Sequence, residues 1–196
     1  MKRTSIFLIL LLFLFSTSGF IGPGPKNTPD KIKWYTFQEA IELGKKKPKK
    51  IYIDVYTQWC GWCKRMDATT FTDPVISKLM NKYFYAVKLD AEMKDTVFFN
   101  NHTFVNPTPN APRSVHQLAS SLFNNEQMSF PTSFYLDENF NLLTKVSSYL
   151  SPTQIEPMIK FFGEDAFKTS KWEDYIKTFK GEAVDPAPVA PPAMPH

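Results

Sequence analysis

The stretch Ile51-Tyr52-Ile53-Asp54-Val55-Tyr56-Thr57-Gln58-Trp59-Cys60-Gly61-Trp62-Cys63-Lys64 decides the fold of this chain. It opens with an apolar run rich in β-branched residues, as in a buried strand, and then breaks into polar residues. The break leads to the only two cysteines among the 196 residues. We therefore expect a strand, a short turn and a helix, with both cysteines at the start of the helix.

The spacing of the cysteines predicts how they work. If the helix begins at Cys60, then Cys63 lies one turn along the same face, and the two sulfur atoms can meet. The first turn of a helix has N–H groups without partners, and these favour a thiolate over a neutral thiol. In such motifs the pKa of a thiol falls from about 8.5 into a range of roughly 3.5 to 7.5. We expect Cys60 to be the nucleophile and Cys63, further inside, to be the resolving thiol.

Asp54 stands out because it is an acid in the middle of an apolar strand. An ionised carboxylate away from water is costly unless it is paired or takes up a proton. Two interpretations stay open at this point: a hydrogen-bonded structural residue, or the proton acceptor for Cys63 when that thiol attacks a mixed disulfide.

These residues resemble a known family. The segment from Asp54 to Lys64 is similar to the active-site segment of thioredoxins and thioredoxin-like thiol-disulfide oxidoreductases. Two further matches follow in the family's order: Val87-Lys88-Leu89-Asp90, whose lysine neighbours the buried acid, and Phe130-Pro131-Thr132, which resembles the cis-proline loop. The resemblance extends from about residue 36 to residue 163. It implies an α/β thioredoxin fold, with a central mixed β-sheet flanked by helices.

The resemblance also implies the roles of individual side chains. Pro131 would face the Cys60–Cys63 turn and leave the backbone of Phe130 free to pair with a substrate chain as an added strand. Lys88 would tune the charge of Asp54. The expected substrate-binding residues are Trp59, Gly61, Trp62, Phe130, Pro131 and Thr132. Without the resemblance, a trans proline at the start of a strand would explain Pro131 as well.

Residues 1–18 are typical of a secretory signal peptide. A basic start, Met1-Lys2-Arg3, precedes an apolar run from Ile6 to Phe15 and then small residues. The run is shorter than the roughly 20 residues that cross a bilayer, so we expect cleavage rather than a permanent span, although an uncleaved anchor stays open. The protein would then be periplasmic or secreted. A three-residue spacing is too short for a useful structural staple, which favours a redox role for the cysteines.

We expect residues 19–35 to form a linker, residues 36–180 a thioredoxin-like domain with a helical extension, and residues 181–196 a disordered tail rich in proline and alanine. Within the domain, Thr36 and Glu39 fit a capping box, and Asp73-Pro74 fits a second helix start. Pro157 predicts a kink or a 3₁₀ turn in the last helix of the family fold.

An insertion separates Asp90 from the Phe130-Pro131 loop. Residues 97–105 fit a hairpin with an Asn100-Asn101 turn, and the pattern from Val115 to Leu122 fits a helix. The insertion either borders the active site and helps to select substrates, or only widens the core.

Composition is that of an ordinary globular protein, with 43% hydrophobic and 21% charged residues. Loss of Lys2 and Arg3 with the signal peptide would lower the formal net charge from +4 to +2, and we expect no nucleic-acid binding. We interpret the lysines of residues 45–50 as a solvated helix end rather than a patch for acidic membranes. His102 and His116 lack the spacing of metal ligands, so we expect no metal.

The sequence thus predicts an exported, monomeric thiol-disulfide oxidoreductase that serves cell redox homeostasis and needs no cofactor beyond a Cys60–Cys63 disulfide. Its expected partners are disulfide-containing proteins and a membrane or envelope redox protein. Whether it reduces, oxidises or isomerises disulfides stays open, with reduction favoured by family likeness. The alternative is a noncatalytic peptide-binding module with an inert Cys60–Cys63 bridge, and a metallochaperone is more distant.

Overall fold

The computed structural model of the protein describes residues 30–124 and 126–188. The predicted signal peptide, most of the predicted linker and the last eight residues of the tail lie outside this range. Among the helices of the described part, none is long and apolar enough to cross a membrane.

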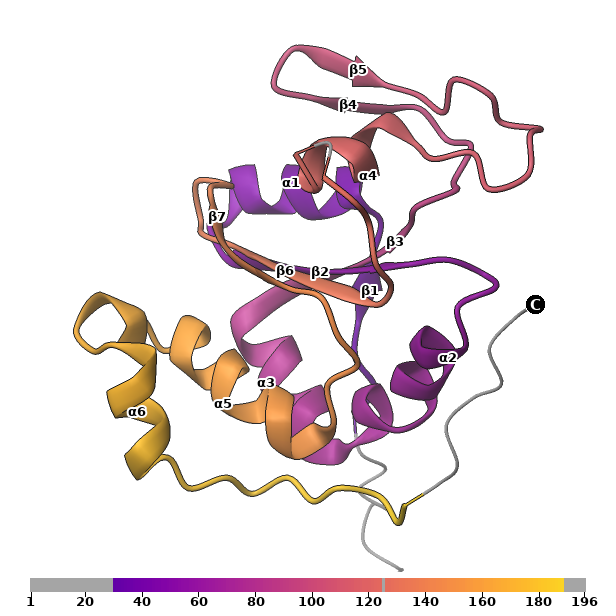
Figure 1. The fold of residues 1–196 in the computed structure, drawn as a ribbon. Helices are drawn as coiled ribbons and strands as arrows, with labels where there is room; N and C mark the ends of the chain where they lie inside the picture. Colours follow the sequence, from indigo (N-terminus) through magenta and orange to yellow (C-terminus); the bar gives the residue numbers. More distant parts are fainter. Residues whose placement is uncertain (1–29, 125, 189–196) are drawn as a thin grey trace, which may run out of the picture.

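A five-stranded mixed sheet forms the centre of the molecule, in the strand order β1-β3-β2-β6-β7 (Figure 1). The strands are β1 (Trp34–Tyr35), β2 (Lys50–Tyr56), β3 (Phe84–Asp90), β6 (Thr132–Leu136) and β7 (Leu142–Val146). The first three run parallel, whereas β6 and β7 are antiparallel to their neighbours. The predicted thioredoxin-like sheet is therefore confirmed, but its edge strand β1 falls in the predicted linker.

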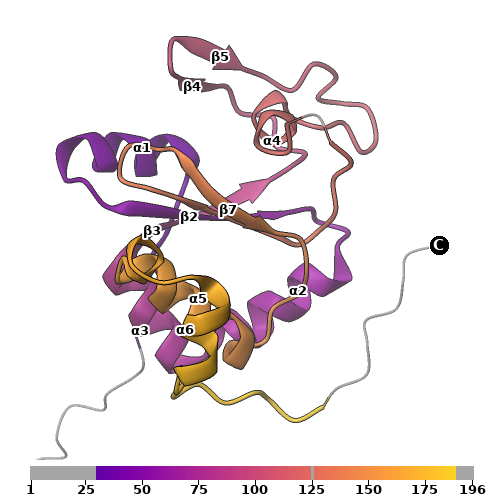
Figure 2. The ribbon, with the colours of Figure 1, turned by 60° about the vertical axis from the view of Figure 1, so that its left-hand side comes forward.

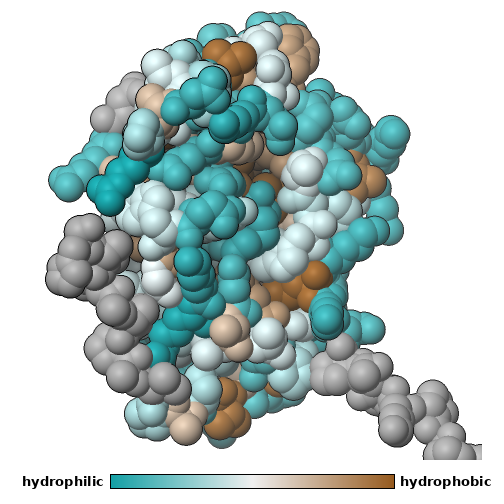
Figure 3. Space-filling model, turned by 90° about the vertical axis from the view of Figure 1, so that its right-hand side faces the viewer, coloured by the Kyte–Doolittle hydropathy of each residue, from teal (hydrophilic) through white to brown (hydrophobic). Residues whose placement is uncertain are grey.

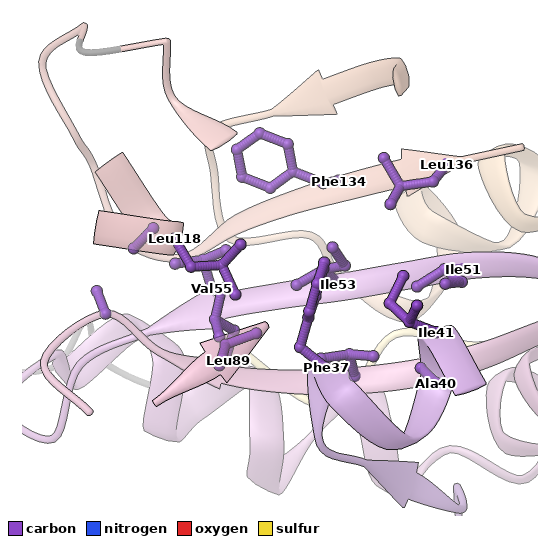
Figure 4. Close-up of a cluster of buried hydrophobic side chains, with 14 of the residues drawn as sticks. Phe37, Ala40, Ile41, Ile51, Ile53, Val55, Leu89, Leu118, Phe134 and Leu136 are labelled. Atoms are coloured by element: carbon purple, nitrogen blue, oxygen red, sulfur yellow. The ribbon is translucent and has the colours of Figure 1, made fainter. Parts of the chain in front are cut away.

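Helices cover both faces of the sheet (Figure 2). On one face lies α1 (Phe37–Lys46), and on the other lie α3 (Pro74–Tyr83) and α5 (Pro152–Gly163). Side chains alternate along a strand, so Ile51, Ile53 and Val55 of β2 face α1 (Figure 4). Tyr52, in contrast, packs among Ile76, Met80, Ile155 and Ile159 on the opposite face. Asp54 lies two residues after Tyr52 in the strand, so its side chain points to the same second face.

The helix starts follow the capping chemistry of the sequence. Thr36 and Glu39 form the predicted capping box of α1. The carboxylate of Asp73 accepts the N–H groups of Val75 and Ile76, and Pro74 takes the first position of α3. Pro157 does not produce the predicted 3₁₀ turn, because α5 continues as α-helix from Pro152 to Gly163.

The insertion contains the predicted hairpin, β4 (Val97–Phe99) and β5 (His102–Phe104), and the helix α4 (Gln117–Leu122). Asn100 and Asn101 adopt left-handed φ angles of 50° and 59°, as the turn requires. The hairpin packs against α1 through the rings of Phe37 and Phe99, whose centroids are 5.5 Å apart. It lies on the face of the sheet opposite α3 and α5 (Figure 1).

The carboxyl-terminal extension packs beside α5. After the 3₁₀ turn η2 (Ala166–Lys168), α6 (Trp172–Thr178) brings Trp172 and Tyr175 against Phe161, at ring-centroid distances of 5.2 and 5.0 Å.

The chain then binds back onto α5 at Glu156, a fully buried carboxylate. It accepts the N–H groups of Glu182 (2.8 Å) and Ala183 (2.8 Å) and pairs with Lys160 (3.1 Å). At Gly181 a Cβ atom would lie 2.6 Å from Glu156 Oε2, so a larger residue there would have to displace the Glu156 carboxylate. Residues 182 and 183 are thus hydrogen-bonded to α5, and the disorder predicted for residues 181–196 stays a prediction.

Candidate active site

Cys60 and Cys63 lie at the start of α2 (Gly61–Ala68), joined by a disulfide with a Cα–Cα distance of 5.3 Å. Cys60 is the N-cap residue, and its sulfur accepts the backbone N–H of Cys63 at 3.0 Å. Both cysteines are nearly buried, with 5% of Cys60 and 2% of Cys63 exposed. The environment that favours negative charge on Cys60 is thus present at the predicted position.

Asp54 is buried beneath the helix layer that includes α2. Only 1% of the residue is exposed, and Oδ2 contacts Lys88 Nζ at 2.5 Å. The second oxygen, Oδ1, has no hydrogen-bond partner among the described residues. Burial raises the pKa of Asp54 to about 6, although the nearby Lys88 charge opposes the shift. Both of the open interpretations fit this geometry, because the residue is paired and also titrates near neutrality.

Lys88 of β3 stands directly beside Asp54 in the strand register. Its Nζ also contacts Oδ1 of Asp67, a residue of α2, at 2.5 Å. Burial lowers the pKa of Lys88, but the two carboxylates outweigh burial and raise the pKa overall. Three rings surround the ammonium group, at 4.6 to 5.4 Å from their centroids: Trp34, Tyr56 and Phe71. Sequence reasoning missed Asp67, because a single acidic residue four positions after Cys63 carries no distinctive signal.

Trp59, the residue before Cys60, is held by the insertion. Its indole N–H donates to Glu92 Oε1 at 3.0 Å, and the guanidinium of Arg113 lies 5.0 Å from the ring centroid. The Phe130 ring packs edge-on against Trp59 at 5.8 Å. The insertion therefore borders the active site, through contacts of Glu92 and Arg113 with Trp59.

Asn106 organises the segment around Arg113, which we call the Arg113 loop (residues 106–116). The side chain of Asn106 is buried, and its amide donates to the carbonyls of Met93 (3.2 Å) and Ser114 (3.0 Å). Its oxygen accepts the N–H of Thr108 at 3.1 Å. Neither Asn106 nor Arg113 was among the predicted site residues.

A groove runs beside the disulfide on the other side. It has a volume of about 390 Å³ and is lined by Trp62, Phe130, Pro131, Ser148, Tyr149 and Gln154. The Phe130–Pro131 peptide bond is cis. Gly61 is the first residue of α2. Thr132, predicted to bind substrate, does not line this groove. Its side chain is buried, and its hydroxyl is hydrogen-bonded to the carbonyl of Ser129 (2.7 Å) and to Ser147 Oγ (2.9 Å).

The surface around α2 and the Arg113 loop is mostly hydrophilic, with small hydrophobic patches between polar residues (Figure 3). Of the two histidines considered as ligands, His102 packs edge-on against Phe104 in the hairpin, and the buried His116 caps α4. In the described residues, no group of three His, Cys, Asp or Glu side chains is placed to hold a metal ion.

Solved structures with a similar fold include the DsbH oxidoreductase (TM-score 0.52, 15% identity), whose comparison covers 76% of this chain and 94% of that one. A thioredoxin from Thermus thermophilus has a TM-score of 0.50 at 14% identity, covering 66% of this chain and 85% of that one. At these identities the likeness shows the thioredoxin fold.

Among curated proteins, spermatogenesis-associated protein 20 of Mus musculus is 35% identical over 78 residues, which are 39% of this chain and 10% of that protein. Uncharacterized protein B0495.5 of Caenorhabditis elegans is 34% identical over 67 residues, which are 34% of this chain and 9% of that protein. The matches span about a tenth of the length of these relatives. A family model described as "Thioredox_DsbH: Protein of unknown function, DUF255" matches residues 17–163. The chain therefore belongs to this DsbH-type thioredoxin-like family.

Proposed function

We propose that the protein is an exported thiol-disulfide oxidoreductase that reduces or exchanges disulfides of envelope proteins through Cys60 and Cys63. The observation that carries the proposal is the position of the Cys60–Cys63 disulfide at the N-terminus of α2, on the sheet face where Asp54 is buried. The disulfide, needing no other cofactor, is the redox group in this proposal.

The reaction starts from the reduced pair. The Cys60 thiolate attacks one sulfur of a substrate disulfide, forms a mixed disulfide and releases the other substrate sulfur as a thiolate. Cys63 then gives its proton to Asp54 and attacks the sulfur of Cys60, which releases the second substrate thiolate. The substrate is reduced by two electrons, and the Cys60–Cys63 disulfide is the oxidised product. A dithiol redox partner must reduce this disulfide again.

Asp54 is suited to the second step because one of its oxygens is free. Lys88 holds Oδ2, whereas the unpartnered Oδ1 can take up a proton. A pKa of about 6 means that the carboxyl group is mostly ionised at neutral pH and still accepts a proton readily.

The substrate chain would lie along the Phe130–Pro131 loop, with the 390 Å³ groove receiving the side chain next to its cysteine. Trp62, Phe130 and Tyr149 make that groove aromatic, so we expect a large apolar residue there. The working protein would be a monomer that reaches the envelope by the signal peptide of residues 1–18. Family membership is consistent with export.

Trapping with Cys63→Ser protein tests the function. In this variant the mixed disulfide on Cys60 cannot be resolved, so cell-envelope extract should yield covalent adducts that a reducing agent releases. The double variant Cys60→Ser/Cys63→Ser is the control and should yield none. If Cys63→Ser protein also yields none, the noncatalytic peptide-binding module with an inert bridge replaces the enzyme. Equilibration with glutathione then gives the reduction potential, which in this fold ranges from about −270 to about −120 mV and decides the direction.

A further inference from the structure

Lys88 is shared between two carboxylates that come from different layers of the fold. Asp54 belongs to the central strand β2, whereas Asp67 belongs to α2, the same helix that carries Cys63. Each carboxylate has one oxygen at 2.5 Å from Lys88 Nζ. Asp67 is 44% exposed at its side chain, so this row of charges runs from the buried acid to the surface.

A cavity lies beside Asp67 and Lys88, at the solvent-exposed end of this row of charges. Its volume is about 620 Å³, and Lys88, Asp67, Trp34, Phe71 and Asp30 are among its lining residues. It shares no lining residue with the groove beside Pro131. The cavity and the groove are lined by different parts of α2: the groove by Trp62 near its start, the cavity by Asp67 near its end.

We propose that Asp67 is a positioning residue that acts on Asp54 through Lys88 and forms, with the 620 Å³ cavity, the route by which the proton held on Asp54 exchanges with solvent. The proposal deepens the function given above and rests on it for its catalytic meaning. A substrate bound in the groove beside Pro131 would leave this route open, because the two spaces share no residue. Release of the proton would therefore not have to wait for release of the product.

The charges around Asp54 explain why Asp67 should matter. Asp67 repels a negative charge on Asp54 and also takes part of the hydrogen bonding of Lys88. Both effects favour the protonated form of Asp54. The hydroxyl of Tyr52, on the same strand, is hydrogen-bonded to Ser133 Oγ at 2.7 Å. The carboxylate of Glu156 on α5 pairs with Lys160 and accepts the backbone N–H groups of residues 182 and 183. The buried side chains of α3 are the apolar Ile76, Leu79 and Met80 and the uncharged Ser77, whose hydroxyl donates to the carbonyl of Phe71 at 3.3 Å.

The test is the substitution Asp67→Asn, with Asp67→Glu as the conservative variant. The titration of the Asp54 carboxyl carbon is followed by ¹³C NMR in the oxidised, full-length protein, so that the measurement does not depend on activity. We expect the midpoint to fall by roughly one pH unit in Asp67→Asn and to return toward the wild-type value in Asp67→Glu. The control is Asp30→Asn, which removes an acid that lines the same cavity but is not one of the described ion-pair partners of Lys88, and should leave the midpoint unchanged.

The kinetic counterpart is the pH dependence of mixed-disulfide resolution by Cys63 in a single turnover. Its acidic limb should move to lower pH in Asp67→Asn in step with the NMR midpoint, whereas a purely structural role of Asp67 would change the rate without moving the limb. A folded Asp67→Asn protein whose Asp54 titrates as in wild type would overturn the proposal. If instead the midpoint moves but Cys63→Ser protein traps no partner, the electrostatic link stands and the proposed function fails.

Discussion

At the scale of single residues, Asp54 links the proposed chemistry to the stability of the fold. Its pKa is raised from 3.8 to about 6 in the folded protein because burial disfavours the charged form. Between these two values the folded state binds more protons than the unfolded chain, so stability falls as pH rises through this window. Above pH 6, where Asp54 is ionised in both states, burial of its charge lowers the free energy of unfolding by roughly 3 kcal/mol, which corresponds to the difference between the two pKa values.

Asp54→Asn should therefore stabilise the oxidised protein at pH 7 by roughly 2 to 3 kcal/mol, while the advantage disappears below about pH 4. Lys88 keeps Asp67 as a partner in this variant, so no buried cation is left alone. Urea unfolding at several pH values measures the effect. Asp174→Asn is the matched control, because Asp174 is exposed and its pair with Lys177 should contribute little. A variant that is less stable than wild type at pH 7 would contradict the assigned cost of burial.

At the scale of elements, the Arg113 loop connects the insertion to Trp59. Arg113→Ala removes the cation from the indole face and should lower kcat/KM for protein disulfides by about two- to five-fold, as expected for a partly exposed cation–π contact. Reduction of a small soluble disulfide, which does not reach Trp59, should stay unchanged. The ratio of the two rates measures the effect.

Two controls separate the loop from the hairpin. Lys94→Ala changes a neighbouring cation that contacts Asn110 and not Trp59, and Phe98→Ser changes the most exposed aromatic residue of the hairpin. Neither should alter the ratio. A change with Phe98→Ser would show that the hairpin, and not the Arg113 loop, selects substrates.

The cap of α4 gives an acid-sensitive contact in the insertion. Nδ1 of His116 accepts the N–H of Leu118 at 3.1 Å, and Nε2 contacts the carbonyl of Asp95 at 2.9 Å, which requires the neutral ring. Burial lowers the pKa of His116 below its ordinary value of 6.5, so the unfolded chain binds the extra proton more readily. The contribution of this cap is therefore present above about pH 6.5 and is lost as the pH falls.

His116→Asn keeps a good N-cap that does not titrate. The difference in unfolding free energy between wild type and this variant should shrink or reverse as the pH falls from 7 to 5, by about 1 kcal/mol, which urea unfolding can measure. A constant difference over this range would show that His116 does not change its protonation on unfolding.

Local chemistry explains which elements could be predicted from the sequence. Thr36 and Asp73 each cap a helix through their own side chains, and Cys60 and Cys63 meet because a helix begins between them. Asp67, Asn106 and Arg113 could not be predicted, because their partners are distant in the sequence or lie in an insertion without a regular pattern. The same reason explains β1, whose two residues form a strand only because β3 offers a free edge.

At the scale of the whole molecule, the carboxyl-terminal segment closes over α5. A chain that ends at Lys180 loses the two backbone donors of Glu156, and a buried carboxylate loses much of its hydrogen bonding. We expect a loss of about 2 kcal/mol of unfolding free energy, measured by thermal and urea unfolding. A chain that ends at Pro188 retains residues 181–188 and serves as the control. Equal stability of the two shortened chains would mean that the contact with Glu156 is not stabilising.

The sheet also separates the surroundings of Asp54 from the insertion, so changes in one need not affect the other. The acid, its lysine and α2 occupy one face, while α1, α4 and the hairpin occupy the other. Mutations, and even gains or losses of whole segments, on the insertion side can accumulate without altering the electrostatic surroundings of Asp54. Relatives with this arrangement could diversify their clients while inheriting the same proton chemistry unchanged.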